Sequence, residues 1–201
     1  ELVRELKTWA APTAHLEQLR EEYLAFVDQG GATALLREHG AAHLTASCFI
    51  FSADLEQTLL CFHRKGRFWV QTGGHVEPED GSVPAAALRE AREEAGLTAL
   101  SLVPGVLDLD RHELAAAFGA CRTHWDVGFA AVATTGELPR VSEESEQVGW
   151  FSIDDLPAPL AGSVATRLQH LRDIVQKNRR GRSSNPARPG QELRPTTPRC
   201  S

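Results

Sequence analysis

The sequence contains no methionine, one tyrosine and no long apolar run. A membrane-crossing helix needs about 20 mainly apolar residues, so none is expected and no membrane partner is predicted. The segment from Glu1 to Pro12 also lacks the basic start and apolar centre of a signal peptide. Because the chain does not begin with methionine, we expect further residues upstream of Glu1.

Cysteine is scarce and is not grouped along the chain. Cys48, Cys61, Cys121 and Cys200 form no CxxC pair and show no zinc-type spacing. The first three lie in apolar runs, where buried and reduced thiols are expected. Reduced thiols are typical of the cytoplasm, which is therefore the expected location.

Positive charge is also in deficit. The 21 Lys and Arg against 27 Asp and Glu give a net charge of −6, which argues against general binding of nucleic acid. The length of 201 residues indicates one domain with appended elements, and the 42% apolar content is ordinary for a globular protein.

Changes in composition divide the chain into three parts. Residues 1–42 show apolar residues at helical spacing and are predicted to form a helical extension that packs on the main domain, as a candidate dimer interface. Residues 43–176 are expected to form that domain. Residues 177–201 are rich in Arg, Pro, Ser and Gly and are predicted to be a disordered basic tail.

The middle part reads as short strands around one central helix. Strands are predicted at residues 43–51, 58–63, 68–71, 123–135 and 148–153, and an amphipathic helix at 164–175. Residues 112–122 have a helical composition but fit a loop or hairpin equally well.

The central helix carries the strongest chemical signal. Ser82 fits its N-cap, and Gly96 fits the position that ends it. Glu90, Glu93 and Glu94 stand at i, i+3 and i+4, so their carboxylates share one helix face. Such a concentration of negative charge is stable only with a cation in front of it, which predicts a divalent-metal platform.

The stretch Gly74–Leu97 resembles the Nudix box, GX5EX7REUXEEXGU, where U is a bulky aliphatic residue. The block from Arg89 to Leu97 matches REUXEEXGU except for Ala91 at the first U. Asp80 stands where the box has its first Glu, and eight residues rather than seven separate it from Arg89. The extra residue falls in the loop before the helix.

This resemblance implies an α/β/α sandwich with a mixed β-sheet, and hydrolysis of a nucleoside diphosphate linked to another group. It implies Mg²⁺ or Mn²⁺ as cofactor, held by Glu90, Glu93, Glu94 and the carbonyl of Gly74. Hard oxygen ligands suit these ions, which stabilise charge on phosphoryl oxygens and produce a nucleophilic water.

Two further residues take roles by the same resemblance. Arg89 would hold one of the glutamates in position. Glu144, in the late acidic loop, is the candidate for an additional metal ligand or catalytic base.

Three residues outside the box are candidates for substrate binding: His75 and Arg67 for phosphate, and Trp125 for stacking on a base. In each case a structural role is the more common one: a loop histidine bonded to backbone for His75, a charged turn for Arg67, and a core position for Trp125. His124 and Asp126 flank Trp125 at period two, so they share a sheet face that could line the pocket.

Two other functions stay open. One is an isomerase of Nudix fold that acts on an isoprenoid diphosphate, which would need a catalytic Cys such as Cys61 or Cys121. The other is a non-catalytic nucleotide sensor. The identity of the linked group is open, and the expected partner is a small nucleotide-type molecule.

Overall fold

The computed structural model describes residues 1–37, 40–114, 121–134, 137–141 and 145–183. Within these residues, eight strands form one mixed sheet. The strands are β1 (Ala42–Phe51), β2 (Gln57–His63), β3 (Phe68–Val70), β4 (Thr72–His75), β5 (Leu100–Leu102), β6 (Asp108–Glu113), β7 (Thr123–Ala133) and β8 (Ser145–Ser152). The strands predicted from the sequence are all present, and residues 112–113 of the ambiguous segment belong to β6.

The parallel pairing of β1 with β7 forms the centre of the sheet. Ten residue pairs, from Ala42–Thr123 to Phe51–Val132, are in register along it. On its other side β1 pairs antiparallel with β2 at one end and with β4 at the other, and β6 and β5 pair with β7. The mixed sheet predicted through the resemblance is therefore confirmed.

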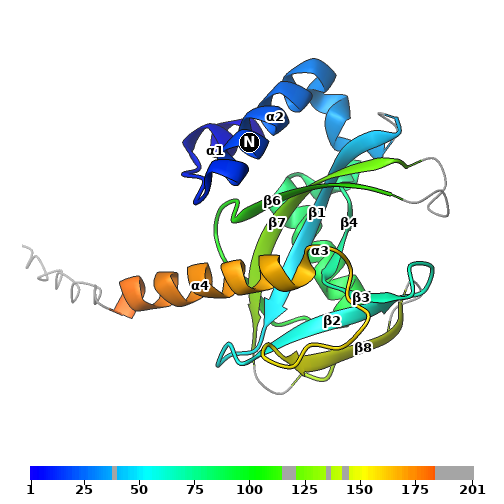
Figure 1. The fold of residues 1–201 in the computed structure, drawn as a ribbon, viewed down its shortest axis with the longest axis vertical. Coiled ribbons are helices and arrows are strands. Elements are labelled where there is room, and N and C mark those ends of the chain that lie inside the picture. Colours follow the sequence, from blue (N-terminus) through cyan, green and yellow to red (C-terminus); the bar gives the residue numbers. More distant parts are fainter. Residues whose placement is uncertain (38–39, 115–120, 135–136, 142–144, 184–201) are drawn as a thin grey trace, which may run out of the picture.

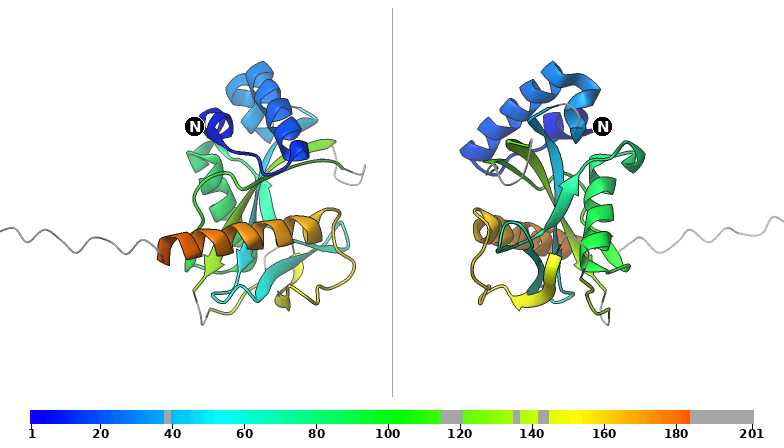
Figure 2. Two further views of the ribbon diagram at one scale, coloured as in Figure 1. Left: turned by 60° about the vertical axis from the view of Figure 1, so that its left-hand side comes forward. Right: turned by 90° about the vertical axis from the view of Figure 1, so that its right-hand side faces the viewer.

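Helices cover both faces of this sheet (Figures 1 and 2). Helix α3 (Val83–Ala95) lies on one face, and α4 (Val164–Ser183) crosses the other. Four alanines of α3, at positions 86, 87, 91 and 95, are fully buried against the sheet. Ala91, which departs from the box pattern, thus allows the helix to lie close to the strands. No helix among the described residues is long and apolar enough to span a bilayer.

The N-terminal helices α1 (Leu2–Thr8) and α2 (Ala14–Gly30) pack at one end of the sheet (Figure 1). Their buried residues belong to the same apolar cluster as those of β1, β7 and α3. The hydroxyl of Tyr23 is buried and donates to the carbonyls of Asp126 and Asp110. Packing of the predicted helical extension on the main domain is therefore observed.

Helix α4 covers the second core with Val164, Leu168, Leu171 and Val175. It continues to Ser183, past residue 176, where the sequence predicted a disordered tail to begin. The Arg179 guanidinium donates to the carbonyl of Ala53 at 2.6 Å, which attaches this last turn to the domain. Residues 184–201 lie outside the described residues.

A buried charge lies on the apolar face of α4. Arg167 is 7% exposed, and its guanidinium donates to Asp108 at 2.5 Å and to Asp126 at 2.7 Å. A Cβ at Gly128 would come within 2.9 Å of that guanidinium, so the glycine makes room for it. Burial disfavours the charge, but attraction by Asp126 and Asp108 raises the pKa of Arg167 above its ordinary value.

Replacing this arginine should therefore destabilise the fold. Arg167→Met leaves Asp108 and Asp126 buried without their counter-charge, and we expect a loss of about 3–5 kcal/mol in unfolding free energy, measured by urea denaturation. The matched control is Arg67→Met, which removes the exposed pair with Glu146 and should cost less than about 1 kcal/mol. Equal losses in the two variants would contradict the role given to Arg167.

Candidate active site

The acidic helix α3 is bounded by the residues that the sequence indicated. The Ser82 hydroxyl accepts from the amide of Ala85 at 3.3 Å, and Gly96 takes the left-handed conformation (φ 65°) just after the last turn. Pro84 lies in the first turn, where a missing amide proton costs nothing. Both ends of the helix are therefore fixed, and with them the positions of its acidic residues along the helix axis.

Two of the acidic side chains press against the glycines of β4. The Glu94 carboxylate accepts from the amide of Gly73 at 2.8 Å and is nearly buried. A Cβ at Gly74 would come within 2.4 Å of the Glu90 carboxylate, so glycine is what permits this close approach. Glu93 points outward and is mostly exposed. The structure thus brings together Gly74, Glu90, Glu93 and Glu94, the predicted metal ligands.

Arg89 ties this helix to the loop that precedes it. Its guanidinium donates to both oxygens of Asp80, at 2.8 and 3.0 Å, and to the carbonyl of His75 at 3.0 Å. It also donates to Glu90 at 3.0 Å and Glu93 at 3.1 Å. The hydrogen bonds from Arg89 are the largest cause of the lowered pKa of Asp80. Asp80 thus braces the loop, despite the extra residue and the change from Glu.

A cavity of about 660 Å³ opens beside these glycines on the α4 face of the sheet. Glu94, Gly73, Gly74 and His75 line one end, and the start of α4 with Arg167 lines the other. The sheet contributes acidic and histidine side chains between them. Such a volume is typical of a site for a small molecule.

His124 and Asp126 both line this cavity, as their shared strand face predicted. Asp126 accepts from the hydroxyls of Thr45 at 3.0 Å and Ser47 at 2.6 Å. Burial lowers the pKa of His124 to about 3, and repulsion from neighbouring histidines adds to the effect. At neutral pH this imidazole is therefore uncharged.

Asp110 connects the wall of the cavity to α4. Its carboxylate accepts from Ser163 at 3.0 Å and pairs with His112 at 2.8 Å. Burial opposes ionisation of this carboxyl, but the His112 hydrogen bond and attraction by Arg167 lower its pKa to about 2. The Asp110 hydrogen bond in turn raises the pKa of His112.

Of the three residues predicted to bind substrate, the structure brings one to the cavity. His75 lines it, whereas Trp125 lies on the opposite face of β7, stacked on Phe26 at 4.6 Å. Trp125 points there because the side chains of a strand alternate, and its neighbours face the cavity. Arg67 is exposed, pairs with Glu146 at 2.5 Å and does not belong to the cavity lining. Glu144 lies outside the described residues.

Sequence reasoning missed several cavity residues, namely Thr45, Ser47, Asp110, His112 and Arg167. For Arg167 a signal existed: it stands three residues after Val164, within the apolar stripe of its helix. A charge at a buried helix position requires partners, and this one could have been noticed. His43, which lies beside His75 and His124, had no such signal, whereas Cys121 stands only three residues before His124 in the sequence.

A mixed sheet between helices, with a glycine pair pressed against an acidic helix at a cavity, defines an enzyme of the Nudix hydrolase class. The family model described as NUDIX domain matches residues 41–171, so the chain belongs to the Nudix family. No curated protein matches the chain.

Solved structures of the same fold agree with this assignment. A MutT NUDIX hydrolase from Burkholderia pseudomallei is 29% identical, with a TM-score of 0.52 over 65% of this chain and 98% of its own. A NUDIX-family hydrolase from Clostridium perfringens is 22% identical, with a TM-score of 0.55 over 66% of this chain and 97% of its own. The dihydroneopterin triphosphate pyrophosphohydrolase of E. coli is 18% identical, with a TM-score of 0.56 over 65% of this chain and 95% of its own.

The low pKa of Asp110 makes stability depend on acidity. The unfolded value is about 3.9, and the folded value is about 2. A carboxyl whose pKa is lower in the folded state stabilises the protein above the unfolded pKa, and that contribution is lost as the pH falls toward the folded pKa.

We expect the stability advantage of wild type over Asp110→Asn to shrink by about 1 kcal/mol between about pH 5 and about pH 3. Both values lie below the ordinary histidine pKa of about 6.5, so His112 stays protonated throughout. Urea unfolding of both proteins at the two pH values measures the difference. An advantage that stays constant would show that Asp110 is not held ionised by its neighbours.

Proposed function

We propose that the chain is a Mg²⁺- or Mn²⁺-dependent hydrolase that cleaves a phosphoanhydride bond in a nucleoside diphosphate linked to another group. One observation carries this proposal. Glu90 and Glu94 lie against the Gly73–Gly74 backbone, next to the exposed Glu93, and Glu94 lines the end of the cavity.

The donor set fits a hard divalent cation. Glu90, Glu93, Glu94 and the Gly74 carbonyl offer oxygen atoms from one helix face and one strand end, and such ligands suit Mg²⁺ and Mn²⁺. A bound cation would stabilise phosphoryl charge and lower the pKa of a water molecule. Like charges at this spacing repel each other; Arg89 offsets part of this repulsion, and a divalent cation would offset the rest.

The protein's own groups orient this platform. The Gly73 amide holds one oxygen of Glu94, and Arg89 holds Glu90 and Glu93 in position. Arg89 also donates to Asp80, so this side chain connects the loop to the helix. Glu144 keeps its proposed role as an additional ligand or catalytic base on the strength of the Nudix resemblance.

The charge of the cavity supports a substrate that arrives with cations. Its described lining includes the carboxylates of Glu94, Asp110, Glu113 and Asp126. The Arg167 guanidinium there is already engaged by aspartates. A diphosphate entering this acidic space would be repelled without divalent ions to bridge it to the carboxylates.

The isomerase alternative gains no support from the cysteines. Cys61 is 1% exposed, and burial raises its pKa well above the ordinary value, so it is held as a thiol. Cys61 and Cys121 are both absent from the described lining of the cavity. The sensor alternative is disfavoured because all three glutamates of the helix are present.

The buried free thiols of Cys48, Cys61 and Cys121 support a cytoplasmic location. A homodimer through the N-terminal helices stays a proposal.

A substrate screen tests the reaction class. The panel comprises ADP-ribose, dinucleoside polyphosphates, modified nucleoside triphosphates, nucleotide sugars and coenzyme-type diphosphates, each with Mg²⁺ or Mn²⁺. We expect release of phosphate, pyrophosphate or nucleotide from at least one of them, and loss of that release with EDTA. Release that is unaffected by EDTA would contradict the metal platform.

Substitution of the glutamates tests the residues. On any active substrate, Glu93→Gln and Glu94→Gln should each lower kcat by about 100-fold or more, because a neutral amide is a poor ligand for a hard cation. Glutamine can still accept from the Gly73 amide, so the thermal unfolding midpoint should change little. The matched control is Glu79→Gln, an exposed acidic residue of the neighbouring loop, which should retain wild-type kcat. Full activity in both test variants would refute the assignment.

A further inference from the structure

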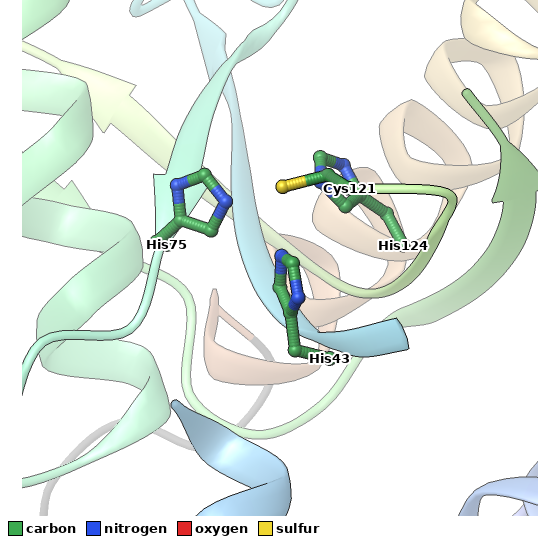
Figure 3. A group of neighbouring side chains, drawn as sticks. All are labelled: His43, His75, Cys121 and His124. Carbon is green, nitrogen blue, oxygen red and sulfur yellow. The ribbon is translucent and has the colours of Figure 1, made fainter. Parts of the chain in front are cut away.

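Four side chains from three separate stretches of the sequence converge beside the cavity. His43 lies on β1, His75 ends β4, Cys121 precedes β7, and His124 lies near the start of β7. Their ligand atoms all lie within 4.8 Å of one another. Figure 3 shows the three rings and the sulfur directed toward a common space.

The sheet pairing explains this convergence. His43 stands opposite His124 in the parallel β1–β7 register, and His75 stands opposite Thr45, two residues along the same strand face. Paired residues present their side chains on the same face. Cys121 is brought to that face by its own neighbour, because the amide of Arg122 donates to the carbonyl of Ala41 at 2.8 Å.

The hydrogen bonds around His43 leave it prepared to bind an ion. Its Nδ1 lies 3.1 Å from the carbonyl of Gly40, so Nδ1 carries the proton and donates it. Nε2 then holds a free electron pair that faces the cluster. A metal-binding histidine ordinarily donates its other N–H to a carbonyl or carboxylate in this manner.

Burial adds an independent argument. His43 is 0% exposed, and Cys121 is 6% exposed. The Nε2 atoms of His43 and His124 are buried and have no hydrogen-bond partner among the described residues. Polar atoms in this state are costly and rare in folded proteins, and an ion between them removes the cost.

We propose that His43, His75, Cys121 and His124 form a tetrahedral Zn²⁺ site, separate from the acidic helix. Three imidazole nitrogens and one thiolate suit zinc, whereas Mg²⁺ and Mn²⁺ prefer oxygen. A tetrahedral zinc site has ligand atoms about 3.3–3.8 Å apart, so small side-chain movements would close the cluster around the ion.

Four protein ligands make this a structural centre rather than a catalytic one. A catalytic zinc keeps one position for water, and none is left here. The ion would join β1, β4 and the start of β7 through side chains alone. His75 directly follows Gly74, and its carbonyl accepts from Arg89, so the zinc would hold in place the strand end on which the acidic platform rests.

Metal analysis of the full-length protein tests this proposal without any activity assay. Protein produced in zinc-supplemented medium and washed with excess Mg²⁺, which would displace zinc from the proposed oxygen site on the acidic helix, should contain about one zinc per chain. Replacement by Co²⁺ should give the thiolate-to-cobalt charge-transfer band and the intense visible bands of a tetrahedral site. Absence of stoichiometric zinc, or stoichiometric binding of another metal instead, would overturn the proposal.

Matched variants assign the ligands. Cys121→Ala should lose the charge-transfer band and lower zinc content by about tenfold, whereas Cys61→Ala, also a buried free cysteine, should keep both. His43→Gln should likewise lose zinc, whereas His112→Gln should retain it, because His112 pairs with Asp110. Full zinc content with an unchanged cobalt spectrum in Cys121→Ala would refute the site. If a variant fails to fold, the zinc content and cobalt spectrum of the wild-type protein decide whether the site exists.

Discussion

The contact between the glycines of β4 and the acidic face of α3 is the constraint on which the candidate active site depends. A Cβ at Gly73 would come within 2.7 Å of the Ser47 Cα, and one at Gly74 would meet the Glu90 carboxylate. A side chain at position 73 would displace the strand end from the sheet, and one at position 74 would displace Glu90 from the strand. Because both positions are glycine, the carboxylates of Glu90 and Glu94 are held against the backbone and away from bulk water. That position is favourable only where hydrogen bonds and cations offset the desolvation.

Local patterns were sufficient to predict the elements and the acidic face. Ser82 and Gly96 mark the ends of α3 through their own backbone chemistry, and Glu90, Glu93 and Glu94 share a face through helical period alone. The period-two pattern likewise placed His124 and Asp126 together. Sequence could not decide which face of β7 would line the cavity, because that depends on where α2 packs. Trp125 therefore lies against Phe26 rather than in the cavity.

Long-range pairing carries the information that the sequence did not reveal. Asp108 and Asp126 lie on neighbouring strands and meet Arg167 of α4, and only the assembled layers bring these three together. The spacing rules for zinc-binding cysteines and histidines assume ligands on adjacent turns of one segment. His43 is far from Cys121 and His124 in the sequence and stands opposite His124 only through the β1–β7 register, so rules based on spacing do not detect this set of residues.

The alternation of β4 connects two kinds of chemistry. Gly74 stands opposite Ala46 and faces α3, whereas His75 stands opposite Thr45 and faces the histidine–cysteine cluster. Consecutive residues of one strand would thus serve the proposed oxygen site on one face and the proposed nitrogen–sulfur site on the other. Hard and borderline cations differ in ligand preference, so the two sites would select different ions from the same solution. Arg89 contacts both sites, because its guanidinium donates to the Glu90 carboxylate and to the His75 carbonyl. This one side chain therefore connects the two sites.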